Sequence, residues 1–273
     1  HSRLPGAPAA MKVLDLLWTG AVSDQRSCRP PWAAEDAPCP YGYVLGLPFS
    51  SFTFPKDPTF INYVAACYAS APFFLAIGFP VVFLWTRGTK ELLGVAFFWL
   101  ASLLVVILKS CINMPRPVGS CLTSCGMPSG HTLDSMAFFT WFLLEVARSR
   151  TLSASSKVTW LCVGGLLLLP VGWSRTVTHD HSWAQVLVGG AIGVALGLGW
   201  YAFLQLRFLY WFLKMLCANV PFLTRNYPFD GVDEEGPWGA RGSGVPVTAI
   251  RASAKDARYG ATSDGAFPGT PSS

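Results

Sequence analysis

The sequence Cys125-Gly-Met-Pro-Ser-Gly-His-Thr-Leu-Asp-Ser135 is a polar turn that opens directly into an apolar stretch. Pro128 can begin a helix there, because its missing N–H would be unpaired in the first turn anyway, and Ser129 can cap it. Gly130 lets the backbone come close to a ligand. The free N–H groups and the dipole of a helix start favour an anion, beside which His131 would lie. The turn predicts a phosphate pocket with a proton carrier, although an ordinary capped turn has the same local sequence.

Two further polar blocks lie where apolar stretches end. The first begins with Lys109 and contains Arg116, and the second begins with Ser174 and Arg175 and ends at His181. A guanidinium can hold a phosphate through two hydrogen bonds, and a lysine adds a positive charge. Basic residues at such places also anchor helices at the membrane surface. It is the combination of the three blocks that indicates a phosphate site.

The order and spacing of the blocks, Lys-x6-Arg-Pro, Pro-Ser-Gly-His and Ser-Arg-x5-His, resembles the three-part signature of the type 2 phosphatidic acid phosphatase superfamily. The resemblance covers roughly Thr59 to Tyr201. It implies a lipid phosphatase that uses no cofactor and no metal. In this resemblance His181 corresponds to the nucleophile that forms a phosphohistidine, and His131 to the general acid. The residues that it assigns to the substrate phosphate are Lys109, Arg116, Ser129, Gly130 and Arg175.

One position departs from the common pattern of the superfamily. The residue four places after the nucleophile is usually an aspartate, but here it is Gln185. This resembles the dolichyl diphosphatase branch, although that branch is expected to have Ser-Ser-His where this chain has Ser129-Gly130-His131. Gln185 can accept a hydrogen bond from Nδ1 of His181 and fix its tautomer. We therefore include Gln185 among the catalytic candidates.

His179 lies two residues before His181, and such a pair invites a metal interpretation. Residues two apart do not share a helix face, and no third ligand has a fixed spacing. The spacing of the third block also selects His181 rather than His179. We expect no metal site.

The composition indicates a membrane protein, because 52% of the 273 residues are hydrophobic and only 13% are charged. In soluble domains about a quarter of the residues are charged. About 20 apolar residues cross a bilayer. We expect an all-α, integral membrane bundle of about five transmembrane helices, which argues against the soluble haloperoxidases of the superfamily. The predicted spans are Phe60–Trp85, Leu92–Leu108, Leu133–Val146, Val158–Trp173 and about Trp183–Leu204.

The ends of the chain differ from this middle. Residues 1–58 are rich in Pro, Gly and Ala and predict an irregular extramembrane segment, residues 59–223 a membrane-embedded phosphatase domain, and residues 224–273 a disordered polar tail. Phe208–Leu223 could be an interfacial helix or an extension of the fifth span. Within that span, the stripe Gly189, Gly193, Gly197 predicts close helix packing.

The positive-inside rule orients the bundle. Arg87 and Lys90 follow the first span and Arg148, Arg150 and Lys157 the third, so these loops are expected in the cytosol and the three motif blocks in the lumen of the endoplasmic reticulum. Cysteines in the lumen are exposed to oxidising conditions. A disulfide could join Cys121 to Cys125 or join either of them to Cys28 or Cys39; the sequence does not fix the pairing.

The leading functional prediction is hydrolysis of a polyisoprenyl diphosphate, with dolichyl diphosphate converted to dolichyl phosphate and phosphate. A phosphatidate-type lipid phosphatase would use the same residues, and a catalytically silent lipid-binding protein of the same fold is the alternative from another class. The net charge of +5 is modest and no basic run indicates nucleic acid. The expected partners are the lipid substrate and the bilayer, and the sequence does not predict an oligomeric state.

Overall fold

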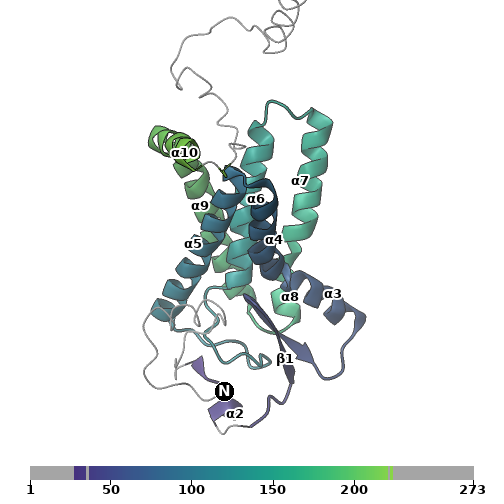
Figure 1. Ribbon diagram of the computed structural model, residues 1–273. Helices are drawn as coiled ribbons and strands as arrows, with labels where there is room; N and C mark the ends of the chain where they lie inside the picture. Colours follow the sequence, from purple (N-terminus) through teal and green to yellow (C-terminus); the bar gives the residue numbers. More distant parts are fainter. Residues whose placement is uncertain (1–27, 35–36, 221, 224–273) are drawn as a thin grey trace, which may run out of the picture. The chain divides into compact units, whose positions relative to one another are not determined.

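The computed structural model describes residues 28–34, 37–220 and 222–223, and the polar tail predicted over residues 224–273 lies outside them. The described chain is a helical bundle with a short β-hairpin at one end (Figure 1). Its elements are α2 (Pro31–Ala34), β1 (Gly42–Leu47), β2 (Ser50–Pro55), α3 (Phe60–Ala69), α4 (Ala71–Thr86), α5 (Thr89–Ile112), α6 (Gly130–Arg148), α7 (Ala154–Leu168), α8 (Pro170–Val177), α9 (Trp183–Leu204) and α10 (Arg207–Asn219).

The predicted membrane bundle is confirmed. Within the described residues, four helical segments are long and apolar enough to cross a bilayer, namely 60–86, 89–112, 154–177 and 183–204. The remaining predicted span, the third (Leu133–Val146), is α6, which begins three residues earlier than predicted and is more polar. It is also the most enclosed helix, since it packs against α4, α5, α7, α8 and α9. Neighbouring helices rather than lipid surround the polar residues at its start.

The first predicted span is divided. The helix breaks at Ser70, and Pro72 follows in the first turn of α4, where a proline needs no partner for its missing N–H. Figure 1 shows α3 lying across the direction of α4, and α3 packs against α8 and β2. The 16 residues of α4 extend about 24 Å.

The sequence left open whether Phe208–Leu223 extends the fifth span or forms a helix of its own. In the structure α10 is a separate helix, because the chain bends between the end of α9 and Arg207.

The predicted close packing of the glycine stripe is confirmed. A Cβ added to Gly189 would lie 2.6 Å from the backbone oxygen of Ser129, and one added to Gly197 would lie 2.6 Å from that of Ala137. One added to Gly193 would overlap the carbonyl of Leu133. Stripes of small residues allow helices in lipid to approach backbone to backbone. The stripe thus sets α9 directly against the start of α6, where the motif histidine lies.

Aromatic rings fill the centre of the bundle. Phe97 of α5 lies 4.9 Å from Phe138 of α6 and stacks at 4.9 Å on Trp200 of α9, measured between ring centroids. Phe79 of α4 stacks on Phe138 at 5.2 Å. Such pairs contribute about 0.5–1.5 kcal/mol beyond their buried area. These contacts pack α4, α5, α6 and α9 against one another in the middle of the bundle.

The prediction of an irregular segment over residues 1–58 is wrong for residues 42–55. These form an antiparallel hairpin in which Leu47 pairs with Ser50, so that Pro48 and Phe49 make a two-residue turn. Phe49 has a φ of 62°, an uncommon value for a bulky residue. Its ring is held edge-on at 5.6 Å from the rings of both Phe98 and Trp99 on α5. Packing against α5 therefore holds a strained turn over the bundle.

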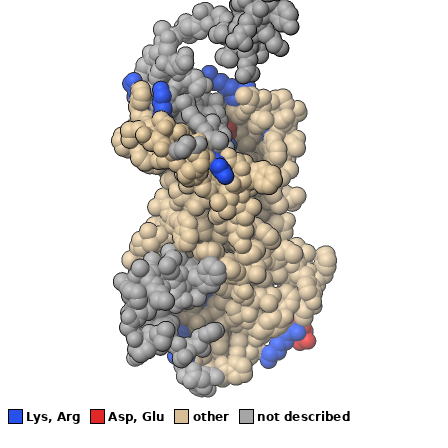
Figure 2. Space-filling model, viewed as in Figure 1, with Lys and Arg blue, Asp and Glu red and all other residues tan. Residues whose placement is uncertain are grey.

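The charged residues lie near the ends of the bundle. On the face shown in Figure 2, the middle of the described surface shows only uncharged residues. The α4–α5 and α6–α7 connections, which carry the basic residues of the predicted cytosolic loops, lie together at one end (Figure 1). The hairpin and the loops before α6 and α9 lie at the other. This separation is what the predicted orientation requires.

Candidate active site

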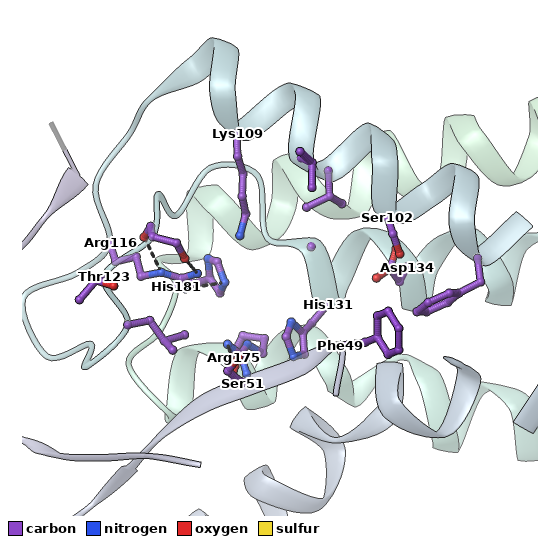
Figure 3. A pocket seen from close by; sticks show the side chains of 16 residues that line it. Phe49, Ser51, Ser102, Lys109, Arg116, Thr123, His131, Asp134, Arg175 and His181 are labelled. Atoms are coloured by element: carbon purple, nitrogen blue, oxygen red, sulfur yellow. Dashed lines mark hydrogen bonds between the residues drawn. The ribbon is translucent and has the colours of Figure 1, made fainter. Parts of the chain in front are cut away.

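Five basic side chains from the three sequence blocks line one pocket of about 130 Å³ (Figure 3). Lys109 comes from the last turn of α5, Arg116 from the loop before α6, and His131 from the first turn of α6. Arg175 comes from α8, and His181 from the turn before α9. All five are predicted site residues. The backbone of α6 also reaches the pocket at Gly130.

The tautomer of His181 follows from its two neighbours. Its Nε2 lies 3.0 Å from Nη1 of Arg116, and its Nδ1 lies 3.2 Å from Oε1 of Gln185. A guanidinium only donates, so Nε2 must accept. The proton of the neutral ring is therefore on Nδ1 and is donated to Gln185, which is the hydrogen bond predicted from the sequence. The lone pair of Nε2 is directed at the cationic side of the pocket.

Gln185 is fixed by three further contacts. Its Nε2 donates to the carbonyl of Pro115 at 2.8 Å, and its Oε1 accepts from the backbone N–H of Ser182 at 3.2 Å. Ser182 in turn accepts from the backbone N–H of Gln185, which completes a capping box at the start of α9. Only 2% of Gln185 is exposed, and it lies behind His181 rather than in the pocket. It joins the nucleophile candidate to the loop that carries Arg116.

Arg175 is fully buried and pairs with Asp180, which is also fully buried, at 3.0 Å. The carboxylate of Asp180 accepts further hydrogen bonds from the backbone and hydroxyl of Thr53 and from the hydroxyls of Ser120 and Thr178. Asp180 is thus saturated and does not contact the ring of His181. The guanidinium uses Nη2 for Asp180 and for the carbonyl of Ser51. Its Nε and Nη1 are buried with no protein partner.

Unpaired buried donors are expensive, so they indicate that something else accepts from them. Arg175 lines the pocket, and two N–H groups of one guanidinium match two oxygens of a phosphate. Lys109 is 6% exposed and lines the same pocket. The pocket therefore offers an anion two donors on one arginine and two further positive charges.

Burial and charge shift the titration of the loop residues. The pKa of His181 is well below its usual value, first because the ring is buried and then because Arg116, Arg175 and Lys109 lie near it. Burial also lowers the pKa of Arg116 to about 10, against the opposing effect of Asp180. Arg116 is still a cation at neutral pH, whereas His181 is neutral and its Nε2 lone pair accepts a hydrogen bond from Arg116.

Arg116 is also held by its own loop. Its Nε donates to the carbonyl of Ser124 at 2.8 Å and its Nη2 to the hydroxyl of Ser124 at 3.0 Å. Its Nη1 donates to the carbonyl of Asp180 at 2.9 Å in addition to its contact with His181. The guanidinium therefore connects the first sequence block to the third.

His131 contacts the hairpin. Its Nε2 lies 3.1 Å from Oγ of Ser50, and Phe49 lines the pocket beside it. Figure 3 shows Phe49 and Asp134 at the end of the pocket that lies away from Arg116. Asp134 and Ser102 also line it, one turn or more deeper in the bundle than His131 and Lys109. These residues were not predicted from the sequence.

Two predictions about the turn before α6 are wrong. Pro128 does not begin the helix, which starts at Gly130 after Ser129 in the cap position. The predicted phosphate ligand Ser129 is fully buried; its hydroxyl bonds to that of Thr132 at 3.0 Å and its N–H donates to Gln185. Because its N–H is used within the protein and its hydroxyl is paired with that of Thr132, Ser129 supports the start of α6, and it does not line the pocket.

His179 lies on the surface with a φ of 56° and does not line the pocket. Across the described residues, no group of three or more His, Cys, Asp or Glu side chains could hold a metal ion. Ser174, also in the third block, donates to the carbonyl of Val171 at 2.7 Å within its own helix. The spacing of the third block thus distinguishes His181, which lines the pocket, from its neighbour.

Two disulfides join the N-terminal segment to the loop before α6. Cys28 pairs with Cys125, with 5.1 Å between their Cα atoms, and Cys39 pairs with Cys121 at 5.5 Å. Of the pairings that the sequence left open, those between the N-terminal segment and the motif loop are therefore present. Cys28 and Cys39 both precede the hairpin, so the two bridges tie the segment that leads into it to the loop before α6.

Comparison with known proteins gives the family of this membrane bundle. Residues 90–209, which contain all three blocks, match the PAP2 superfamily. A membrane-embedded helical protein with a buried cationic pocket and two histidines is the class that the fold and site define. Over residues 90–209 the chain is similar to the PAP2 superfamily.

Several relatives have modest identity to this chain. The dolichyldiphosphatase of Saccharomyces cerevisiae is 26% identical over 182 residues, which cover 62% of this chain and 76% of the relative. Human dolichyldiphosphatase 1 is 27% identical over 155 residues, 53% of this chain and 65% of the relative. Lipid phosphate phosphatase epsilon 2, chloroplastic, of Arabidopsis thaliana is 31% identical over 110 residues, 37% of this chain and 35% of the relative.

Among solved structures, the chain is similar to the transmembrane PAP2 type phosphatidylglycerolphosphate phosphatase of Bacillus subtilis. The TM-score is 0.45 and the identity is 20%, with 54% of this chain and 78% of the other covered.

Proposed function

We propose that this protein is a membrane lipid phosphatase that hydrolyses a polyisoprenyl diphosphate, with dolichyl diphosphate as the leading substrate, through a phosphohistidine on His181. The observation that carries the proposal is the state of His181. It is neutral, its proton is held by Gln185, and its Nε2 lone pair is directed at the cationic pocket. A histidine in this state is a nucleophile at neutral pH.

The terminal phosphate of the substrate would bind first. Its oxygens accept from Nε and Nη1 of Arg175, the donors that the protein leaves unpaired, and from Lys109. Arg116 exchanges its contact with Nε2 of His181 for a phosphate oxygen, and this frees the lone pair beside the phosphorus. The three cations then neutralise the charge that develops in the transition state.

In the first chemical step, Nε2 of His181 forms a bond to the phosphorus while the bond to the leaving oxygen breaks. His131 gives a proton to that oxygen, and the lipid leaves as its monophosphate. In the second step, water attacks the phosphohistidine, His131 takes a proton from it, and inorganic phosphate leaves His181 neutral again. Gln185 keeps the Nδ1 proton throughout.

Two observations support a polyisoprenyl substrate. The first is Gln185 in place of the commoner aspartate, together with relatives that are named dolichyldiphosphatases. The second is that the pocket continues from the cations along α5 to Val105, Val106 and Phe98. This end inside the bundle is apolar apart from Ser102 and Asp134, and it suits the lipid part of a substrate. The Arabidopsis relative makes a phosphatidate-type lipid phosphatase the second candidate.

We also propose that the pocket faces the lumen of the endoplasmic reticulum. The basic α4–α5 and α6–α7 connections would then be cytosolic, and the disulfide-linked hairpin would be in an oxidising compartment. A glycosylation acceptor introduced at Val118, which is 79% exposed beside the pocket, should be modified. Labelling of this site by a reagent confined to the cytosol would contradict the orientation.

The function is tested by phosphate release from purified protein in detergent. Dolichyl diphosphate should be hydrolysed faster than phosphatidate, and His181→Ala should reduce release to the level of buffer. His179→Ala is the matched control, because this exposed histidine lies two residues away and should leave activity unchanged. Faster release from phosphatidate would support the second candidate. Release from neither lipid would indicate a catalytically silent member of the family.

A further inference from the structure

We propose that Ser50, at the tip of the N-terminal hairpin, is a positioning residue for His131. Its hydroxyl oxygen accepts a hydrogen bond from Nε2–H of His131, so that Nδ1 is the nitrogen that exchanges protons with the substrate. This inference rests on the proposed function of His131 as the proton donor. Ser50 lies outside residues 90–209, the part of the chain that matches the superfamily.

Counting hydrogens gives the direction of the contact. Ser50 is 2% exposed, and its hydroxyl donates to the carbonyl of Ala69 at 2.7 Å. Ala69 is the last residue of α3, so its carbonyl has no partner within the helix. A hydroxyl has one hydrogen, and Ser50 has used it. The contact at 3.1 Å between Ser50 Oγ and His131 Nε2 is therefore a hydrogen bond donated by the ring.

The hydroxyl of Ser50 is held beside His131 by the contacts of the neighbouring hairpin residues. Ser50 is paired with Leu47 at the end of the ladder, and the carbonyl of the next residue, Ser51, accepts from Arg175. Two residues further on, Thr53 binds the carboxylate of Asp180 through its N–H and its hydroxyl. Ser50 is thus tied to the same groups that position the phosphate ligands, and it holds the ring of His131 in register with them.

The consequence for proton transfer follows. A neutral ring with its proton on Nε2 is what remains after an imidazolium has given up its Nδ1 proton. In the first step the Nδ1 proton passes to the leaving oxygen as the P–O bond breaks, and Nε2 keeps its proton, which remains hydrogen-bonded to Ser50. In the second step the Nδ1 lone pair takes a proton from the attacking water, which restores the imidazolium. Without Ser50 the ring can rotate and can hold its proton on either nitrogen.

The alternative is that Ser50 has only a structural role and anchors the hairpin to α3 through its bond to the carbonyl of Ala69. The two roles differ in how activity depends on the leaving group, because proton donation matters more when the leaving oxygen is more basic. Phenyl phosphate and p-nitrophenyl phosphate have leaving groups of similar shape and different basicity. A loosened hairpin should slow both reactions equally, whereas a misplaced proton donor should mainly slow the hydrolysis of phenyl phosphate.

The experiment compares wild type, Ser50→Ala, Ser50→Thr and His131→Ala as full chains in detergent on the two aryl phosphates. Ser50→Ala should lower kcat/KM for phenyl phosphate by about tenfold or more, up to the 10²–10⁴ that general acid catalysis contributes. Its kcat/KM for p-nitrophenyl phosphate, which reports only the steps up to the phosphohistidine, should change by less than about threefold. His131→Ala should show the same pattern with a larger loss, and Ser50→Thr should recover most of the activity, because it keeps the hydroxyl. Ser70→Ala is the control, since its hydroxyl bonds only to Ala66 at the same end of α3.

An equal loss on both substrates, or no loss in Ser50→Ala where His131→Ala shows the leaving-group pattern, would overturn the role of Ser50 and leave the proposed function intact. If wild type hydrolyses neither aryl phosphate nor the lipids, the proposed function fails instead. NMR of ¹⁵N-labelled histidine decides the hydrogen bond without activity. His131 should carry its proton on Nε2 in wild type and lose this preference in Ser50→Ala; an Nδ1 proton in wild type contradicts the assignment.

Discussion

Replacing Gln185 by alanine removes the acceptor for the Nδ1 proton of His181. The ring then either leaves a buried N–H unpaired or turns to find another acceptor, and an unsatisfied buried donor costs about 1–3 kcal/mol. Arg116 still donates to Nε2 and still favours the productive tautomer. Only 3% of His181 is exposed, so water cannot replace the lost acceptor, and we take the upper half of that range. Since each 1.36 kcal/mol is tenfold in rate, kcat should fall on the order of a hundredfold.

A second variant separates the two functions of this side chain. Gln185→Ala also removes the donor to the carbonyl of Pro115, which precedes Arg116, and could therefore loosen the phosphate loop. Gln185→Glu keeps an acceptor for His181 but places a carboxylate against that carbonyl. If tautomer control dominates, the glutamate variant should retain activity within about tenfold and lose thermal stability. If anchoring of the loop dominates, it should fail as alanine does, and KM should rise in both.

Steady-state kinetics of phosphate release from the preferred lipid, with thermal unfolding measured on the same preparations, make the comparison. Near-normal turnover of Gln185→Ala beside an inactive His181→Ala would refute the orienting role. Asp180 would not then be the substitute, since its carboxylate is fully used by Arg175 and the hydroxyl donors.

Three further predictions concern pH, packing and the disulfides. Because burial and the neighbouring cations lower the pKa of His181, the attacking neutral form persists on acidification; kcat/KM should stay level through pH 6.5, and an acid limb at or above that value would contradict this. Gly193→Ala should destabilise the protein by about 1–3 kcal/mol through overlap with α6, measured by thermal unfolding, whereas Gly190→Ala, whose new Cβ meets nothing closer than 3.7 Å, should be tolerated; equal melting temperatures would refute the packing argument. Replacing Cys28 and Cys125 by serine opens a bridge between residues 97 apart and should cost about 2–5 kcal/mol; unchanged unfolding and activity would show that the hairpin is held without it.

The site could largely be predicted because each sequence block lies where an apolar helix begins or ends. Lys109 ends α5, His131 begins α6, and His181 precedes α9. In an up-and-down bundle, the end of one membrane-spanning helix lies on the same side of the membrane as the start of the next. The end of α5 and the starts of α6 and α9 therefore lie on one side, where the three blocks meet. The i+4 spacing from His181 then identified Gln185 as its partner.

The hairpin was missed because its contacts are distant in sequence. Thr53 and Asp180 are separated by 127 residues and Ser50 and His131 by 81, and no local pattern encodes such pairs. A signal for the hairpin itself was present: two aromatic and β-branched runs separated by two residues, Pro48 and Phe49. The many prolines and glycines around them favoured an irregular interpretation.

The error at Ser129 has a similar origin. A serine at a helix start usually offers its hydroxyl to the backbone or to a ligand. Here Gly189 brings α9 so close that Ser129 is enclosed, and its N–H bonds to the carbonyl of Gln185. The burial of a helix start depends on the neighbouring helix, which local sequence does not specify.

The central claim, that His181 is the nucleophile, is tested most directly by trapping the intermediate. Purified protein is mixed with lipid diphosphate labelled with ³²P at the terminal phosphate and quenched in alkali within a turnover, and the labelled peptide is identified by mass spectrometry. We predict an alkali-stable, acid-labile phosphoryl group on His181, present in wild type and His179→Ala and absent in His181→Ala. Phosphate release at the wild-type rate by His181→Ala, or label on another residue, would contradict the claim.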